Sequence, residues 1–360
     1  MKTLIAVAAV AAAIVQVPAH AQDLDSLLNN VDFSFGGYGT AGIVRTDTDR
    51  AQFVRSIEKS GATQSPREST DSNLGVQATA RFNSWLSATV QVLASSNELT
   101  DVVSWAYLKI DPVDNLSFKL GKVEMPLFAI SDSRDINYAN VWLRAPNEVY
   151  SLANMEELRG GEFTYSLPIG STHLSLTGYA GNSTVVIPID VFNAWDVHGG
   201  ELRWETEWVT LRAGLATAVP ELGPGLYDRY TFYGFGALVD HDNIIAQAEY
   251  VRRKADAYTM EVNSTGYYVL GGYRFGKVAP YVSYASTTKS QPYYAPYALS
   301  LDQDTAAVGV RWDAFKSADI KFQFERVDPK GTAGISFTQI QPGFGNSIVN
   351  VASLTIDFIF

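Results

Sequence analysis

The sequence contains no cysteine, only four histidines, and fewer basic than acidic residues. The absence of cysteine excludes a disulfide scaffold and a metal site built from thiolates. Asp and Glu total 38 against 27 for Lys and Arg, a formal charge of −11, and this acidic balance argues against a nucleic-acid partner. Because the histidines are scattered, we expect no metal site and no cofactor.

Long apolar runs are also missing once the first residues are set aside. Those residues have the three parts of a secretory signal: Lys2, the apolar run Leu4–Val15 and the small-x-small sequence Ala19–Ala21. We expect cleavage near Ala21, which makes residues 1–21 a signal peptide. No later stretch approaches the roughly eighteen apolar residues that a spanning helix needs, so we expect no transmembrane helix in the mature chain.

What the sequence does contain is aromatic residues, glycine and short alternating stretches. It has 19 Tyr, 18 Phe and 7 Trp beside 28 Gly. Apolar and polar residues alternate over several residues at a time, which indicates half-buried strands. We expect sixteen strands, near residues 31–45, 71–82, 85–94, 100–110, 116–122, 158–167, 173–181, 196–204, 208–218, 226–240, 244–254, 266–275, 278–287, 304–314, 320–327 and 347–360.

The connections between these strands alternate in length. Those after odd strands are long or at least not tight turns, among them 46–70, 182–195 and 219–225, and those after even strands are short. An even number of strands with short turns at one rim and longer loops at the other is typical of an outer-membrane barrel. Only a closed sheet pairs every backbone group in lipid. The expected fold class is therefore all-β, a 16-stranded antiparallel transmembrane β-barrel over residues 22–360.

One connection, Glu124–Glu157, runs for over thirty residues without any alternation. A loop that long in a compact domain is usually functional. Large side chains such as Trp142 and Tyr150 suit a packed wall, whereas its charges suit water. We therefore expect this loop to fold into the barrel and to place five charged residues at a constriction: Asp132, Arg134, Asp135, Arg144 and Glu148.

The polar faces of the strands are expected to line the interior. Charge on the lipid face of a strand costs a few kcal/mol, so charged residues within strands should face inward. The expected lining residues are Tyr107, Lys119, Glu162, Arg203, Arg212, Arg274 and Arg311. If the loop acids project toward these arginines, a transverse field crosses the interior. Charges near strand ends are instead expected to be solvated rim groups, namely Lys109, Lys321 and Asp357.

The chain resembles the sixteen-stranded porins of Gram-negative outer membranes. The resemblance is carried by the signal peptide, FGGYGTAGIV at Phe35–Val44, the long fifth connection, VGVRWD at Val308–Asp313 and the terminal aromatic residue. It implies location in the cell outer membrane, contact with outer-membrane lipid, a homotrimer, and an assembly signal at Phe358 and Phe360 that the barrel assembly machinery recognises. The family's acidic-aromatic-glycine motif is missing from the long loop, so the resemblance implies no selectivity.

The function that we expect is passive diffusion of small hydrophilic solutes and ions through a water-filled channel. The alternative is a channel specific for a sugar or a carboxylate, because arginines and tyrosines in the lining (Tyr38, Tyr107, Tyr268 and Tyr281) suit such solutes. A barrel hydrolase needs a nucleophile beside a base. Only His198 lies away from a short turn, and no nucleophile motif flanks it, so we expect no enzyme.

Overall fold

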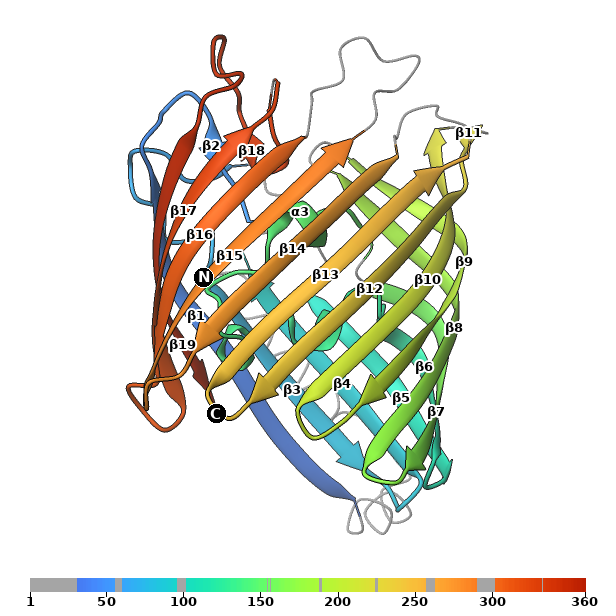
Figure 1. The fold of residues 1–360 in the computed structure, drawn as a ribbon. Helices are drawn as coiled ribbons and strands as arrows, with labels where there is room; N and C mark the ends of the chain where they lie inside the picture. Colours follow the sequence, from blue (N-terminus) through green and yellow to red (C-terminus); the bar gives the residue numbers. More distant parts are fainter. Residues whose placement is uncertain are drawn as a thin grey trace, which may run out of the picture.

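The computed structural model describes residues 31–360 except for 56–59, 96–101, 154, 156, 188–189, 224–225, 257–262, 290–301 and 332. The expected signal peptide, with its cleavage near Ala21, lies outside the described residues. The described chain forms one closed antiparallel barrel of sixteen long strands, as the sequence predicted (Figure 1). The barrel closes because β1 pairs with β3 on one side and with β19 on the other.

Fifteen of the sixteen pairings between long strands join strands that follow one another in the chain, and the sixteenth, between β1 and β19, closes the barrel. Their bounds are β1 (Asp32–Thr46), β3 (Asn73–Arg81), β4 (Leu86–Ser95), β5 (Val103–Val113), β6 (Leu116–Glu124), β7 (Glu157–Ile169), β8 (Thr172–Ile187), β9 (Asp190–Glu205), β10 (Val209–Gly223), β12 (Tyr230–His241), β13 (Ile244–Ala255), β14 (Ser264–Tyr273), β15 (Val278–Lys289), β16 (Gln303–Trp312), β17 (Ala318–Pro329) and β19 (Val349–Ile359).

The prediction of a longer connection is wrong at two places. Residues 182–195 mostly continue β8 and β9, with Val186 opposite Val191. Residues 219–225 mostly continue β10, which pairs with the short strand β11 (Leu226–Tyr227). The β-branched and aromatic residues in the first of these segments favour strand, and that local preference outweighs the spacing argument.

Strand residues alternate between an exposed apolar outer face and an inner face. On β1, Phe33 and Phe35 are exposed on the outside, whereas Tyr38 and Thr40 are buried inside. On β19 the outward Leu354 and Ile356 alternate with the inward Ser353, Thr355 and Asp357 in the same way. The outer face is therefore the face that an apolar bilayer covers.

The long connection folds into the barrel. It contains the short helices η1 (Ser131–Ser133), η2 (Asn137–Ala139) and α3 (Asn147–Tyr150). Figure 1 shows α3 inside the barrel, behind the front strands, where it contacts β13, β14 and β15. No helix in the described part of the chain is long and apolar enough to cross a membrane.

The hydrophobic core lies inside the barrel, between this loop and the inner wall. Phe128, Trp142 and Tyr150 of the loop pack on Phe232 of β12 and Tyr268 of β14. The wall that faces these rings is apolar, since the loop's large side chains exclude water from it, whereas other parts of the loop cover charged wall residues such as Arg212 and Lys321.

A second apolar cluster joins the outer connections 47–72 and 330–348. Strand β2 (Gln52–Phe53) of the first pairs with β18 (Phe337–Thr338) of the second. The rings of Phe53, Phe337 and Phe344 pack together beside Val44 of β1. These two connections therefore form one packed unit over the end of the barrel that carries the long connections.

The two terminal aromatic residues cover glycines at the seam between β19 and β1. Gly37 and Phe360 exchange two backbone hydrogen bonds, of 2.9 and 3.0 Å. A Cβ on Gly37 would lie 2.3 Å from the Phe360 ring, and a Cβ on Gly39 would lie 2.5 Å from the Phe358 ring. Only glycine leaves room for these rings, so the sequence GGYG and the terminal phenylalanines belong to one feature of the fold.

Candidate functional site

Basic side chains of the wall hold the loop by its backbone carbonyls. Lys321 Nζ donates to Asn137 O at 2.5 Å, and Arg311 Nη1 donates to Tyr138 O at 2.7 Å. The carbonyls of Pro126, Ala129 and Leu152 accept in the same way from Arg212, Arg203 and Arg253. Hydrogen bonds from a charged donor are roughly twice as strong as neutral ones. The wall cations therefore anchor the loop. For Arg203, Arg212 and Arg311 this differs from the arrangement considered above, in which they would face the loop acids.

Arg203 and Arg212 share one carboxylate, that of Glu201. The Arg203 Nε lies 2.9 Å from one Glu201 oxygen, and the Arg212 Nε lies 2.5 Å from the other. The Arg212 side chain is buried under the loop, whereas that of Arg203 is 23% exposed. Of these two expected lining residues, Arg203 is thus the one that reaches water.

Arg144, expected at the constriction, is buried among acids instead. Its guanidinium binds both oxygens of Asp71, at 3.0 and 2.6 Å, and also contacts Glu325. It lies 4.9 Å from the centre of the Phe53 ring. Three buried charges thus hold the loop against β17 and the outer connection 47–72. Arg144 does not face water.

Glu148 is also fully enclosed, which differs from its expected place facing the wall arginines. Gln303 Nε2 donates to its carboxylate at 2.6 Å, and the Thr305 hydroxyl donates to the same oxygen. Burial raises the pKa of the Glu148 carboxyl, and the two hydrogen bonds partly oppose this shift. This residue therefore positions α3 against β16.

The water-facing charges of the loop are near η1. Asp132 is exposed, and Arg134 and Asp135 are half-exposed. Asp135 lies 3.6 Å from Arg55 of the outer connection, which also donates to Arg134 O at 3.3 Å. Asp132 interacts electrostatically with Lys119 on β6 and with Arg203 on β9. Asp132 is thus an exposed loop acid within electrostatic range of two wall cations.

Lys119 belongs to a small group on the wall opposite η1. Its Nζ lies 2.7 Å from Glu162 of β7 and 5.7 Å from the centre of the Tyr107 ring on β5. The Lys119 side chain is 32% exposed, whereas Glu162 is buried beneath it. The structure therefore brings together three of the expected lining residues: Lys119, Glu162 and Tyr107.

The inner face of the neighbouring strands carries small hydroxyl side chains that bond to one another. Thr79 pairs with Thr89, Thr164 with Thr177 and Ser166 with Ser175, each at 3.0 Å between oxygens. No loop residue is bonded to them among the described contacts. This side of the interior is polar, and all of these residues except Thr89 are partly exposed, whereas the loop buries the wall on the other side.

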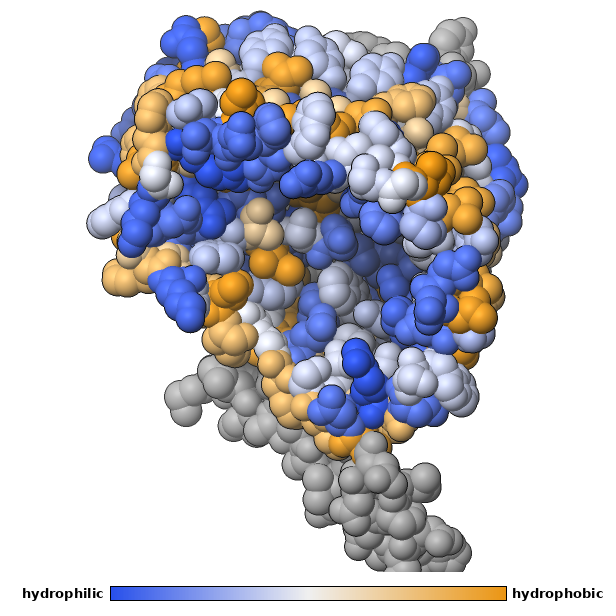
Figure 2. Space-filling model, turned by 60° about the horizontal axis from the view of Figure 1, so that its bottom comes forward, coloured by the Kyte–Doolittle hydropathy of each residue, from blue (hydrophilic) through white to orange (hydrophobic). Residues whose placement is uncertain are grey.

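Arg274 and Arg311 lie toward the end with the short turns. Arg274 binds both oxygens of Asp240 at 2.6 Å, and Arg311 Nε lies 2.8 Å from Asp313. These four residues, with Tyr138 of the loop, border a space of about 640 Å³ that is partly open to solvent. Figure 2 shows this end of the molecule hollowed at its centre, with hydrophilic residues around the hollow.

The prediction of solvated rim groups is wrong for two residues. Lys321 and Asp357 are fully buried, with 2.9 Å between Lys321 Nζ and the Asp357 carboxylate. Asp319, also fully buried, lies 3.1 Å from Arg311. The cause is η2, which covers this part of the wall. Lys109 does remain partly exposed, beside Asp111 at 2.9 Å.

Sequence reasoning missed the contacts between the long loop and the outer connections. The Asn147 amide donates to Val54 O at 2.8 Å and to the Ser336 hydroxyl at 2.9 Å, which joins three connections at one side chain. No local pattern marks such residues, because the partners are 93 and 189 positions apart.

The described residues hold no group of three or more His, Asp or Glu that could bind a metal ion. His198 lies beside Asp196 and Thr217 on the outside of the barrel. Its Nε2 is 3.0 Å and its Nδ1 is 3.4 Å from the same Thr217 oxygen. A hydroxyl that lies on a ring-nitrogen lone pair would be much farther from the other nitrogen. The pair thus lacks the alignment that a base and a nucleophile need.

A model of the Gram-negative porin family matches residues 6–345. Among solved structures, OmpF of Salmonella typhi in complex with daunomycin superposes with a TM-score of 0.63 at 13% identity, over 92% of this chain and 99% of that one. The anion-selective porin of Comamonas acidovorans gives 0.59 at 12% identity, with 92% and 100% covered. The trimer form of OmpT, an outer membrane protein of Vibrio cholerae, gives 0.56 at 14%, with 92% and 99% covered. No curated protein matches the chain.

Proposed function

This chain belongs to the Gram-negative porin family and forms a diffusion channel in the outer membrane, and we propose that its water path runs along one side of the barrel only. The path lies between η1 of the loop and the inner faces of β3–β9 toward the short turns. The observation that carries this proposal is the contrast between two parts of the interior. The loop covers one part of the wall and buries both its apolar and its charged residues, and the other part carries small hydroxyl side chains that no described loop residue bonds.

The narrowest part of this path is formed by Asp132 on the loop and by Lys119 and Arg203 on the wall. Asp132 is exposed, and both cations are partly exposed and interact with it electrostatically. Each cation also has a carboxylate beside it, Glu162 or Glu201. Because acid and base nearly balance, we expect weak ion selectivity and passage of small hydrophilic solutes. Channel selectivity is determined by the charges at the narrowest point.

The test is the reversal potential of single channels of the purified protein in a KCl gradient. Asp132→Asn should shift the preference toward anions, and Lys119→Gln should shift it toward cations. Salt screens charges over about 10 Å at 0.1 M, so a charge remote from the path has little effect. Asp114→Asn, the same change in an exposed short turn, is the matched control. Equal effects of Asp132→Asn and Asp114→Asn would place the water path elsewhere.

A channel specific for a sugar or a carboxylate is the alternative. Two of the tyrosines that suggested it, Tyr268 and Tyr281, are buried beneath the loop and do not face the proposed path. This favours general diffusion along the polar side. We also propose that the protein is not an enzyme, since His198 lacks a nucleophile aligned with its lone pair.

We propose a homotrimer that contacts outer-membrane lipid and is inserted by the barrel assembly machinery. The trimer form of the similar Vibrio cholerae protein supports the first part. Small outward residues on β1 and β3, namely Ala41, Ala78 and Ala80, would let a second copy approach closely. Cross-linking in intact cells distinguishes a trimer from a monomer.

A further inference from the structure

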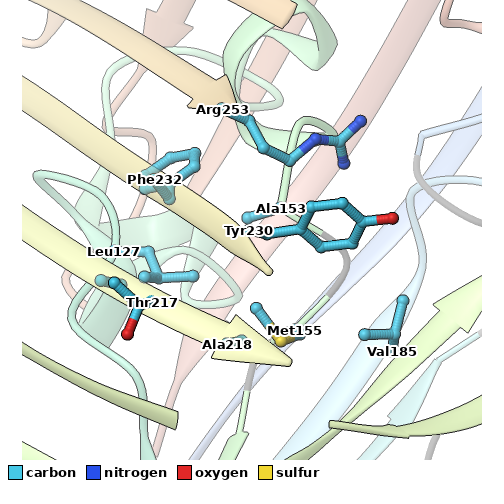
Figure 3. Close-up of a pocket in the computed structure, with 10 residues that line it drawn as sticks. Leu127, Ala153, Met155, Val185, Thr217, Ala218, Tyr230, Phe232 and Arg253 are labelled. Atoms are coloured by element: carbon cyan, nitrogen blue, oxygen red, sulfur yellow. The ribbon is translucent and has the colours of Figure 1, made fainter. Parts of the chain in front are cut away.

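Two basic residues of β13, Arg252 and Lys254, lie on the outer face of the barrel. The residue between them, Arg253, points inward: Figure 3 shows its side chain beside that of Tyr230, and its guanidinium lies 5.9 Å from the centre of the Tyr230 ring. Successive side chains of a strand point to opposite faces. Arg252 and Lys254 therefore share the outer face with Tyr250, which is 39% exposed.

Tyrosines mark the edge of the apolar band on this part of the outer face. Tyr250 lies opposite Tyr267 of β14, which is 41% exposed. Tyrosine is enriched where the apolar core of a bilayer meets the lipid headgroups. Because β13 runs from a short turn toward a long connection, Arg252 and Lys254 lie beyond Tyr250, away from the membrane centre. Long basic side chains at this edge extend into the headgroup layer.

Hydroxyl side chains flank the two cations on the neighbouring strands. Arg252 lies opposite Tyr233 of β12 and opposite Thr265 of β14. Lys254 lies opposite Thr231 of β12. Residues directly opposite one another in a sheet have Cβ atoms about 5 Å apart. Two cations and several hydroxyl donors are therefore within reach of one small anionic group on the membrane-facing surface.

The two cations differ from the basic residues inside the barrel in their partners. Lys119 and Arg212, inside, each lie beside a carboxylate. Arg252 and Lys254 form no ion pair or hydrogen bond through their side chains among the described contacts, and the Lys254 Nζ lies 5.9 Å from the centre of the Tyr233 ring. The charge of both side chains is therefore available to a group outside the protein.

We propose that Arg252 and Lys254 bind the phosphate of a membrane lipid, with the hydroxyls of Thr231 and Thr265 donating to the same group. Lysine binds phosphate as a point charge, and arginine can donate two parallel hydrogen bonds to it. The inference goes beyond the proposed function, because this site lies on the outside of the barrel and takes no part in the water path. It gives one face of the barrel a preferred lipid.

The surface next to the cations favours a lipid over free phosphate. Phe235 of β12 and Val269 of β14 lie on the same outer face, toward the membrane centre, and are 56% and 52% exposed. Acyl chains attached to a phosphate at Arg252 would lie along this apolar surface. The strands β14–β19 separate β13 from β1, so the copy that we propose at β1 and β3 leaves this face to lipid.

Binding is measured by native mass spectrometry of the refolded protein, titrated in detergent with dimyristoyl phosphatidic acid. Dimyristoylglycerol supplies the same chains without the phosphate, and inorganic phosphate supplies the group without the chains. We expect each to bind at least about tenfold more weakly than phosphatidic acid, because each cation contributes about fivefold to the binding of an anionic lipid. Equal binding of dimyristoylglycerol, or displacement of the lipid by an equal concentration of inorganic phosphate, overturns the proposal.

Variants test the position of the site. Arg252→Gln combined with Lys254→Gln should weaken the binding of phosphatidic acid at least about tenfold. Arg45→Gln combined with Arg326→Gln is the matched control, and it should bind as the wild type does. These two residues are also exposed on the outer face near the long connections, but each has an aspartate two positions further on in place of a second cation. Equal weakening by the two double variants overturns the proposal.

Conductance shows that a loss of lipid binding is local. The channel with Arg252→Gln and Lys254→Gln should conduct KCl in planar bilayers as the wild type does, because both side chains lie outside the barrel interior. Weakened binding of phosphatidic acid with unchanged conductance is the expected result. Unchanged binding in this double variant overturns the proposal and leaves the proposed function untouched.

Discussion

At the scale of single residues, the charges of the long loop fall into two kinds. Arg144 and Glu148 are enclosed and bind wall residues, whereas Asp132 and Asp135 reach water. A buried charge is tolerated only where partners compensate for its lost hydration. The enclosed charges therefore position the loop, and we propose that the exposed ones act on solutes.

We expect Arg144→Gln to destabilise the barrel by about 3–5 kcal/mol, because Asp71 and Glu325 would stay buried without their cation. The measurement is the urea midpoint of unfolding of the refolded protein. Arg50→Gln, at an exposed position of an outer connection, is the control and should change the free energy of unfolding by less than about 1 kcal/mol. Similar midpoints for the two variants would show that the buried cluster contributes nothing.

Glu148→Gln should change how stability depends on pH. Because burial raises its pKa, the folded protein binds a proton more tightly than the unfolded chain does. Glu148 therefore lowers stability as pH rises above the usual glutamate pKa of about 4.3, until the raised pKa is passed. Glutamine is neutral throughout, so the variant should gain stability relative to the wild type as pH rises.

The urea midpoint from about pH 4 to about pH 8 measures this difference between Glu148→Gln and the wild type. Glu68→Gln, at an exposed position, should follow the wild type over the whole range. A constant difference between Glu148→Gln and the wild type would mean that Glu148 is ionised at the same pH in the folded and unfolded states.

At the scale of elements, the long loop is held on two sides. The wall cations bind its carbonyls from below, and Arg55, Asp71 and Ser336 of the outer connections bind it from above. A loop fixed at so many points keeps its shape without regular secondary structure. The width of the proposed water path therefore depends on the contacts that hold the loop as well as on the loop's own residues.

Deleting Ser131–Ala145 should widen the path and raise single-channel conductance, because it removes η1, η2 and Asp132. The deletion also removes Arg144, so it is best combined with Asp71→Asn and Glu325→Gln, which neutralise the acids left behind. If this protein folds and its conductance and selectivity equal those of the wild type, the loop does not limit the path.

The strands could be predicted from the sequence because alternation is a local signal. Each of the sixteen strands was predicted. The main error, at residues 182–195, concerned where β8 ends and where β9 begins. The inward position of the loop also followed, from its mixture of large and charged side chains. The partners of its charges did not, because Arg144 binds residues 73 and 181 positions away.

The character of the inner wall was predicted only in part, for a related reason. Alternation assigns a side chain to a face but does not say what covers that face. Tyr268 was predicted to line the water-filled interior and Lys321 to be a solvated rim group, but both lie beneath the loop, where no water reaches them. Burial inside a barrel depends on another segment of the chain and cannot be obtained from the strand alone.

At the scale of the whole molecule, the barrel is completed by the contact of its last residues with its first strand. Phe360 contributes two backbone hydrogen bonds to Gly37 and a ring that covers the glycine. This contact supports the proposal that Phe358 and Phe360 also serve in assembly, since both residues lie where the barrel closes.

Deleting Phe360 should lower the yield of folded barrel severalfold without altering the conductance of the molecules that do fold, because the residue lies outside the proposed water path. Phe315→Ala, at an exposed aromatic residue in a short turn, is the control and should fold as the wild type does. Normal assembly of the chain that lacks Phe360 would contradict both the structural role and the signalling role proposed for this residue.

The pairing of β1 with β19 determines when the protein can finish folding. Tyr38 lies opposite Ile359, so more than three hundred residues separate these partners along the chain. Contacts between residues so distant along the chain form slowly, because a very long loop has to close first. During that delay both strands expose unpaired backbone groups that other polypeptides can join, which leads to aggregation. Newly synthesised chains therefore need protection from aggregation during export. The slowest strand pairing in the sheet determines how long that protection is needed.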